Sequence, residues 1–232
     1  MDKKTLRPFL RNKTAMAGLA MAAAFALCAA AAPLLTPYAP LEQVMERAFA
    51  PPSLSHFFGA DEMGRDIASR VLYGARVSML IGVVSVAIAL AGGTLLGLAA
   101  GYAGGRTDFL LMRLVDVMLS FPSVLLAVVV VAILGPKLEN AMIAVGIVGI
   151  PEYARLVRAS VLAEKEKEHV QAAVALGAGH MRIVRVNILP NILSPLIVQS
   201  TLRFATAVLD AAGLSFLGLG AQPPDIEWGL ML

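Results

Sequence analysis

The sequence is poor in charge for its length. Only 15% of the 232 residues are Asp, Glu, Lys or Arg, whereas an ordinary soluble domain carries about 25%. Hydrophobic residues make up 58% of the chain, and the mean hydropathy is +0.77. A soluble globular domain is therefore excluded, and the composition indicates an integral membrane protein.

The chain also lacks the residues from which metal, nucleotide and nucleic-acid sites are built. Its one cysteine, Cys28, can form neither an intrachain disulfide nor a thiolate metal cage. His56, His169 and His180 have no second ligand at metal spacing, and no GxxxxGK[ST] phosphate loop occurs. The net charge of +3 is spread between apolar runs rather than gathered in a patch. We expect no catalysis, no cofactor, no metal and no nucleic-acid partner, so any ATP must be bound by another subunit.

Three runs without charged residues are long enough to cross a bilayer. About 20 helical residues span the roughly 30 Å of hydrocarbon, at 1.5 Å per residue. The three runs contain 28, 29 and 20 residues and cover 14–41, 77–105 and 117–136. Each is predicted to be one membrane-spanning helix.

Two further spans are less regular. Only 12 uncharged residues lie between Glu139 and Glu152, so a fourth helix must continue through Pro151 towards Arg155. A fifth begins after Pro195 and is interrupted by charged residues. The sequence thus predicts an all-α protein with five visible spans.

The distribution of basic residues predicts the orientation. With a cytoplasmic N-terminus, 13 Lys and Arg residues fall on the inner side and five on the outer side, as the positive-inside rule requires. Without the fourth span, six basic residues from Arg155 to Arg185 would lie outside. We therefore expect a cytoplasmic tail 1–13, a first transmembrane helix 14–36, a periplasmic loop 37–76 and a membrane core 77–232 with a cytoplasmic loop 158–190.

The first apolar run has an alternative interpretation. A basic start and small residues at Ala29 to Ala32 are also found in cleavable signal peptides. We interpret the run as an uncleaved anchor. Leu27 precedes Cys28 where a lipoprotein signal needs a small residue, so acylation is not expected.

The second span contains glycines at every fourth residue. They share one helix face, where small residues allow a neighbouring helix to approach closely. We expect helix packing along this face, at Gly93, Gly97, Gly101 and Gly105.

The fifth span contains a carboxylate and a guanidinium. Asp210 and Arg203 are seven residues apart and so share a helix face, separated by about 10 Å of rise. A charged residue in a span faces the protein interior or a water-filled path. Asp210 is therefore expected either to contact a neighbouring helix or to line a pathway.

The cytoplasmic loop contains a small apolar surface. Val170, Ala173 and Val174 lie on one side of a short helix, which Gly177 and Gly179 would end with left-handed backbone angles. A second short helix is expected over 180–189, before Pro190 opens the fifth span. Two short helices at an angle would present alanines to a docking partner.

This loop resembles the "EAA" loop of binding-protein-dependent ABC importer permeases. "QAAVALG", nine residues and "NILP" follow the family spacing. Gln171 stands where the family usually has glutamate, and Asn187 where it usually has isoleucine. The positions that match are Ala172, Ala173, Gly177, Leu189 and Pro190.

The remaining segments resemble the C-type permease subunit of dipeptide, oligopeptide and nickel importers. They are "FGADEMGRDIASRVLYGARVSM", "GYAGGRTDFLLMRLVDVMLSFPSVLLAVV" and "LSFLGLGAQPPDIEWGLML". The resemblance implies the type I importer permease fold in a bacterial inner membrane. It also implies four further partners: a homologous permease subunit, two ATPase subunits that bind the ATP, and a periplasmic solute-binding protein. The segment 171–177 would be a coupling helix docked in a cleft of one ATPase.

Two alternatives accompany this interpretation. The substrate expected from the resemblance is a dipeptide or oligopeptide, with a nickel complex as the alternative. Family members continue after the "WGxML" stretch into a sixth span, whereas this chain ends at Leu232. A shortened core, and with it a non-transporting remnant, is therefore the alternative to a working permease.

Overall fold

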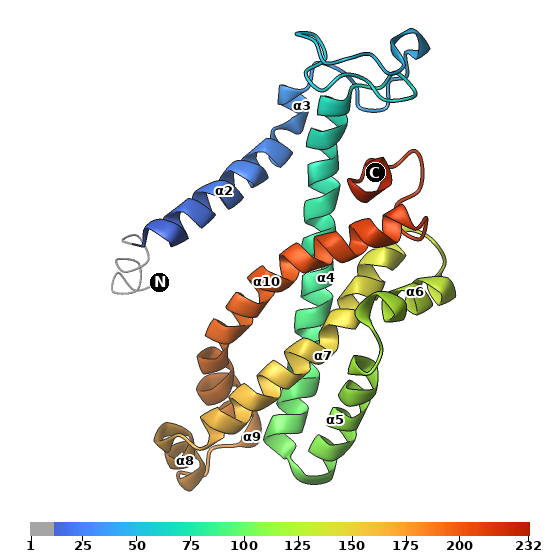
Figure 1. Cartoon of the computed structure of the whole chain (residues 1–232). Coiled ribbons are helices and arrows are strands. Elements are labelled where there is room, and N and C mark those ends of the chain that lie inside the picture. Colours follow the sequence, from blue (N-terminus) through green and yellow to red (C-terminus); the bar gives the residue numbers. More distant parts are fainter. Residues whose placement is uncertain (1–11) are drawn as a thin grey trace. The chain divides into compact units, whose positions relative to one another are not determined.

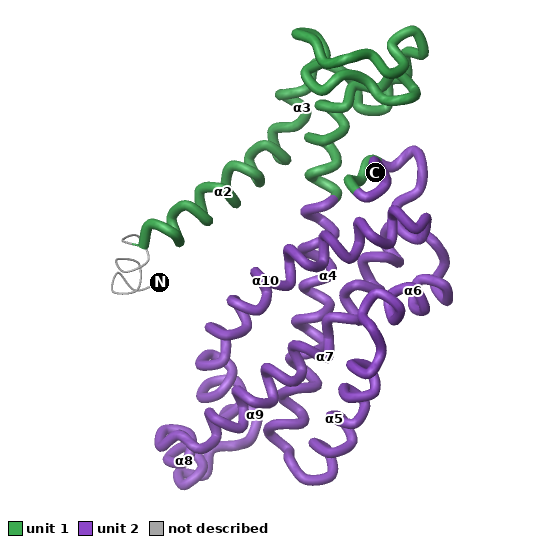
Figure 2. Tube along the Cα trace, in the orientation of Figure 1, with its two compact units in different colours: residues 1–77, 226–228 green, residues 78–225, 229–232 purple. Residues whose placement is uncertain are grey.

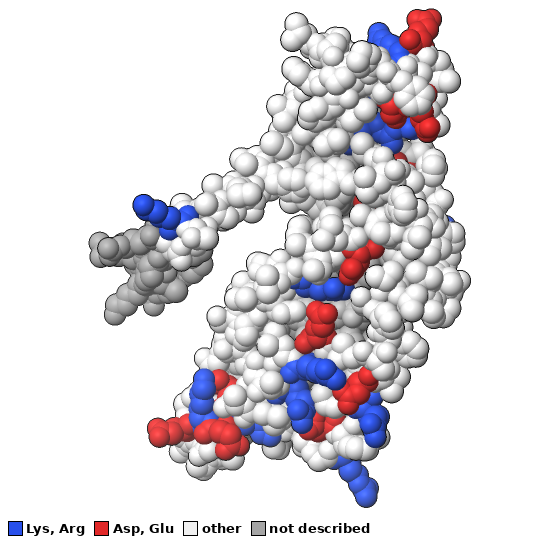
Figure 3. Space-filling view, in the orientation of Figure 1, with Lys and Arg blue, Asp and Glu red and all other residues white. Residues whose placement is uncertain are grey.

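The computed structural model describes residues 12–232 (Figure 1), so the first eleven residues of the expected tail lie outside the described part. The described chain contains helices and no strand, apart from an isolated bridge between Ala60 and Asp66. The prediction of an all-α protein is confirmed. Figure 3 shows few charged side chains on the visible face, as the composition predicts. The chain forms two compact units (Figure 2), one of residues 1–77 with 226–228 and the other of residues 78–225 with 229–232.

The first unit begins with two apolar helices, α2 (Lys13–Ala30) and α3 (Ala32–Leu35). The Asn12 side chain caps α2, because its oxygen accepts hydrogen bonds from the backbone N–H groups of Thr14 and Ala15 at 3.1 and 3.2 Å. Nearly all of the α2 surface is exposed and apolar. Such a helix is suited to contact with lipid.

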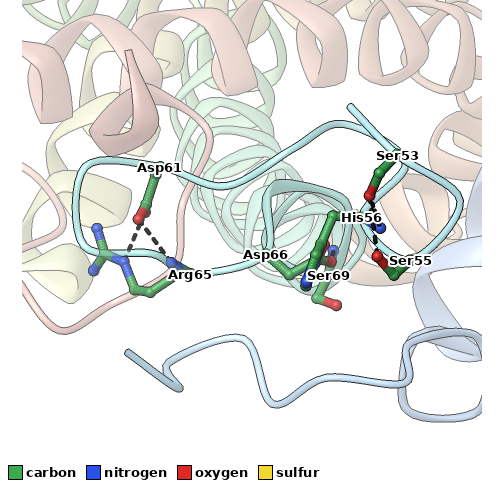
Figure 4. Close-up of polar contacts among 7 residues, drawn as sticks. All are labelled: Ser53, Ser55, His56, Asp61, Arg65, Asp66 and Ser69. Carbon is green, nitrogen blue, oxygen red and sulfur yellow. Dashed lines mark hydrogen bonds and ion pairs between the residues drawn. The ribbon is translucent and has the colours of Figure 1, made fainter. Parts of the chain in front are cut away.

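The loop after α3 is held by ion pairs (Figure 4). The Asp61 carboxylate accepts a hydrogen bond from Arg65 Nε at 2.7 Å and also pairs with Arg70. The loop includes a short 3-10 turn, η1 (Met45–Arg47). His56 Nδ1 lies 2.9 Å from Asp66 Oδ1. The two carboxylates organise a segment that has little regular secondary structure.

Helix α4 (Ile67–Ala103) starts inside the segment expected to be a loop. The last ten residues of the expected loop 37–76 form its first turns. The reason is local, since Asp66 Oδ2 accepts a hydrogen bond from the Ser69 N–H at 2.7 Å and so caps the helix. A carboxylate is also favoured at the positive end of a helix dipole.

The second unit is organised around α7 (Leu138–Lys165), the most buried of the long helices. Helix α7 runs through Pro151 as expected and packs against α5, α6 and α10. The other elements of this unit are the rest of α4, α5 (Gly105–Leu119), α6 (Ser123–Leu134), α8 (Glu168–Ala175), α9 (His180–Arg182), the π-helix η2 (Ile183–Ile188), α10 (Leu189–Phe216) and η3 (Gly229–Met231).

Four glycines spaced four residues apart were expected to share one helix face, and three of them pack against the α7 backbone. A Cβ atom added to Gly93, Gly97 or Gly101 would lie 2.7, 2.6 or 3.0 Å from the carbonyl oxygens of Ile150, Ala154 and Arg158, respectively. These glycines allow α4 and α7 to approach closely. The expectation for Gly105 was wrong. Gly104 and Gly105 both have positive φ, so α4 ends at Ala103 and Gly105 begins α5 in open space.

The expected single span 117–136 is broken. Helix α5 ends at Leu119 and α6 begins at Ser123, with a bend of 95° between them. The cause is Pro122, which has no N–H to continue the helix and restricts the preceding residue to extended angles. Within residues 12–232, four helices are long and apolar enough to cross a membrane, or five if this bent pair counts as one span. The five predicted spans agree with the larger count.

The expected separate helix 180–189 does not end before the fifth span. Helix α9, the π-helix η2 and α10 form one continuous run from His180 to Phe216. The wider π-helical turn directly precedes Pro190, whose ring would clash with a carbonyl in a regular helix interior. Pro190 is thus accommodated inside the run.

Candidate coupling site

Helix α8 contains the matching part of the "EAA" pattern, and Gly177 ends it. Gly177 has φ +75°. Its N–H donates to Val174 O at 2.9 Å, and the next N–H, of Ala178, donates to Ala173 O at 3.0 Å. This is the Schellman arrangement, in which glycine adopts left-handed angles without strain. The expected role of Gly179 was wrong, because its φ is −67° and it precedes α9 as the N-cap.

One face of α8 packs inward and the other remains exposed. Val170 is buried against Ile183 and Ile188 of the π-helix, in a cluster that also includes the end of α7. Val174 and Leu176, in contrast, are 57% and 88% exposed. Ala172, two residues before Val174, is exposed as well, so the described chain leaves several apolar side chains of α8 and its end uncovered. Such a surface fits docking of a protein partner.

Gln171 makes a contact within its own chain. Its Nε2 donates a hydrogen bond to the Glu166 carbonyl oxygen at 3.1 Å, which closes the turn before α8. Since a carboxylate has no N–H to donate, glutamate could not make this bond. The departure from the family pattern therefore stabilises the start of the helix.

The ends of α4 and α7 support α8 from behind. Lys165 Nζ donates to the Tyr102 carbonyl oxygen at 3.0 Å, and Tyr102 Oη lies 2.8 Å from His180 Nδ1. A pocket of about 430 Å³ opens here, and its lining consists of Tyr102, Lys165, Val170, Gln171, Val174, Ala175, His180 and Ile183. The ends of α4 and α7, together with His180 and Ile183, thus meet α8 at this pocket.

A buried carboxylate connects α7 to α8. The Glu164 side chain is 5% exposed and lies 2.6 Å from Lys167 Nζ and 3.3 Å from His169 Nε2. The same His169 nitrogen lies 3.3 Å from Asn191 Nδ2 of α10. A run of charged residues on a helix usually forms a solvated face, but Glu164 is buried. Val157, Val161 and Glu164 stand at positions i, i+4 and i+7, so they share the buried face of α7. This spacing could have predicted that Glu164 is buried.

The two ends of the predicted motif occupy different places. Ala172, Ala173 and Gly177 lie on α8 or at its end. Leu189, the first residue of α10, packs against the buried cluster that includes Val170, and Pro190 is the second residue of α10. The fold joins the two halves of the motif through Val170, Ile183 and Ile188 rather than placing them on one surface.

The fold also brings Asp210 and Arg203 together. Asp210 Oδ2 lies 3.2 Å from Arg203 Nη1, and the Arg203 side chain is 7% exposed. The long arginine side chain bridges the two helical turns between them. Asp210 therefore has a contact within the chain, on its own helix.

Two family models match the chain. Residues 93–232 match the model of the family described as "Binding-protein-dependent transport system inner membrane component", and residues 3–52 match the "N-terminal TM domain of oligopeptide transport permease C".

Curated relatives extend the similarity over nearly the whole chain. The di/tripeptide transport system permease protein DppC of Pseudomonas aeruginosa is 49% identical over 99% of this chain and 78% of the relative. Dipeptide transport system permease proteins DppC are 49% identical in Alkalihalophilus pseudofirmus, over 99% of this chain and 76% of the relative, and in Escherichia coli K12, over 97% and 77%. The chain therefore belongs to the inner-membrane components of binding-protein-dependent transport systems, a family of multi-pass transport permeases and not of enzymes.

Proposed function

We propose that this chain is a permease subunit of an ATP-driven importer of short peptides, and that α8 is its coupling helix. The observation that carries the proposal is the exposed apolar surface of α8, held at its start by Gln171, at its end by Gly177 and from behind by Glu164. The relatives are named for dipeptide transport, which favours a peptide over nickel as substrate.

The proposed partners follow from the same arrangement. The chain pairs with a homologous permease subunit, and two ATPase subunits bind the ATP. A periplasmic binding protein delivers the peptide, and the N-terminus lies in the cytoplasm. When the ATPases close on ATP they move α8, and the buried Glu164 contacts transmit that movement to α7 and α10. A rigid-body change between two states of the pathway follows.

Paired glycine substitutions test the coupling role. Gly177→Val introduces a β-branched side chain at φ +75°, whereas Gly179→Val does so at φ −67°, and neither position has an atom within 4 Å of the added Cβ. We expect the first to lose both co-purification with the ATPase and dipeptide uptake, and the second to retain both. The difference arises because only left-handed angles strain an added Cβ.

The outcomes separate the alternatives. An unaltered chain that never co-purifies with an ATPase would support a non-transporting membrane protein instead. Co-purification without uptake would support a remnant that still docks. Equal behaviour of the two glycine variants would remove the role given to the end of α8.

A further inference from the structure

The connection between α3 and α4 contains a segment without charge that exposes large apolar side chains. No Asp, Glu, Lys or Arg occurs over residues 48–60, which are called the apolar loop. Four of its side chains are more than half exposed: Phe49 at 76%, Leu54 at 94%, Phe57 at 71% and Phe58 at 59%. Exposed apolar groups gathered in this way mark contact with lipid or with another molecule.

Hydrogen bonds hold the apolar loop in a fixed shape. The N–H of Phe49 donates to the carbonyl oxygen of Asp61 at 3.0 Å. At the turn of the loop, the N–H groups of Ser53 and Gly59 both donate to the carbonyl oxygen of His56, at 2.8 and 2.9 Å. The exposure of the apolar side chains is therefore a property of the folded loop.

The backbone is strained at one of the exposed side chains. Phe49 has φ +56°, and it is the one residue other than glycine with a positive φ within residues 12–232. Left-handed angles bring the Cβ atom of an ordinary residue too close to its own backbone, so they cost free energy. Strain of this kind persists where the surrounding structure requires the conformation, and it is found at functional sites.

His56 connects the apolar loop to the ends of two membrane helices. Its ring stacks on the Tyr38 ring, with the centroids 4.5 Å apart. Its Nδ1 lies 2.9 Å from Oδ1 of Asp66, the residue before α4 (Figure 4). Tyr38 follows Leu35, the last residue of α3, by three residues, so their Cα atoms are at most about 11 Å apart. The apolar loop therefore lies close to the point where α3 ends.

That point lies at the surface of the membrane. Helices α2 and α3 together extend from Lys13 to Leu35, about 35 Å at 1.5 Å per residue, which is just sufficient to cross the roughly 30 Å of hydrocarbon. The surface of α2 is almost entirely exposed and apolar, and α3 continues it with Leu34, which is 89% exposed. The surface suited to lipid is thus continuous from α2 through α3, and the stacked Tyr38 and His56 rings join it to the apolar loop.

We propose that the apolar loop inserts its exposed leucine and phenylalanine side chains into the lipid headgroup layer of the membrane surface at which α3 ends. Uncharged aromatic and aliphatic side chains are favoured there, at the boundary between headgroups and acyl chains. Because the loop is held in a fixed shape, little conformational entropy is lost on insertion. The contact is independent of the substrate that the protein carries.

Tryptophan fluorescence tests the insertion. The full chain is reconstituted in vesicles of phosphatidylethanolamine and phosphatidylglycerol, with or without a phosphatidylcholine brominated near the top of its acyl chains, because bromine quenches tryptophan on contact. Leu54→Trp and Phe57→Trp are two independent probes at exposed positions, so neither opens a cavity in the core. Glu62→Trp, an exposed position beyond the apolar loop, is the control. The emission of Trp228, the one native tryptophan, is measured in the unaltered chain and subtracted.

We expect Leu54→Trp and Phe57→Trp each to lose about half of their emission in brominated vesicles, since a ring at the headgroup level meets the bromine. Glu62→Trp should lose little.

Three results would overturn the inference. Unchanged emission of both apolar-loop probes would show that the loop does not reach the lipid. Equal quenching of Glu62→Trp would show that the membrane does not select the apolar loop. Unquenched probes whose emission moves to shorter wavelength when the solute-binding protein is added would show that a protein covers the loop instead.

Discussion

The Glu164 carboxylate lies 3.3 Å from the His169 ring nitrogen across the turn that joins α7 to α8. A long membrane helix and the short helix proposed to couple it to ATP hydrolysis are thus connected by a buried side chain. The same His169 nitrogen lies 3.3 Å from Asn191 Nδ2 of α10, so contacts of α8 extend to two membrane helices.

Loss of the Glu164 charge should uncouple the importer. Glu164→Gln keeps the size of the side chain but removes the ion pair with Lys167 and the carboxylate charge beside His169, so α8 is held less firmly. We expect dipeptide uptake to fall about fivefold or more at an unchanged level of the chain in the membrane. Glu166→Gln, an exposed carboxylate two residues away, is the control and should leave uptake normal. Equal uptake in both variants would contradict the role of Glu164.

Close packing of α4 on α7 should make Gly97 intolerant of a methyl group. Gly97→Ala places a Cβ 2.6 Å from Ala154 O, so the helices must separate, which costs about 1–3 kcal/mol. Gly18→Ala in α2 meets no atom within 4 Å and is the matched control. Thermal unfolding of the purified chain in detergent measures the difference. A Gly97 variant as stable as the Gly18 variant would show that the two helices do not pack this closely.

The loop before α4 should lose stability in acid. Burial raises the pKa of the Asp66 carboxyl, but hydrogen bonds from Ser69 and His56 outweigh it, so the pKa lies below its usual value. Burial also raises the pKa of the Asp61 carboxyl, but hydrogen bonds from Arg65 and Met63 outweigh it, so this pKa too lies below its usual value. A carboxylate with a lowered folded-state pKa contributes stability above its unfolded pKa of about 3.9. That contribution is lost as the pH falls through the folded value.

Protease sensitivity of the loop, measured between pH 7 and pH 3, checks this expectation. Cleavage should increase below about pH 4. Asp66→Asn should be cleaved more readily at neutral pH and should show a smaller acid effect. An acid response that is the same with and without Asp66 would contradict the assignment.

The ion pair between α5 and α7 should be exchangeable. Arg158 donates two hydrogen bonds to Asp108, at 2.5 and 2.6 Å, across two helices that pack together. Asp108→Arg alone brings two cations together and should lower the amount of folded chain in the membrane. Asp108→Arg combined with Arg158→Asp should recover much of it, because the pair is restored with its charges exchanged. No recovery in the double variant would show that the bidentate geometry, rather than charge, is what matters.

Several features could be predicted because they depend on neighbouring residues. Composition and charge-free runs identified a helical membrane protein, since crossing hydrocarbon requires only length and hydropathy. The spacing from Ala172 to Pro190 located the candidate coupling segment. The end of α8 at Gly177 also followed, because left-handed angles are a local property of glycine.

Two breaks between helices were not predicted, although their causes are local. The four-residue spacing predicted that Gly105 continues the glycine face of α4. Positive φ angles at Gly104 and Gly105 instead turn the chain away from α4. An uncharged run over 117–136 concealed the 95° bend at Pro122, because hydropathy carries no information on direction.

By itself, the sequence determined that the protein lies in a membrane and that it is helical. It also located the segment proposed to meet an ATPase. Only the tertiary structure decided which charges are buried. Glu164 and Lys167 belong to the same charged segment, yet packing encloses the first and leaves the second 57% exposed. Likewise, the enclosure of Arg203 and the exposure of Glu152 come from how α7 and α10 cross, and burial is a property of that packing rather than of the local chain.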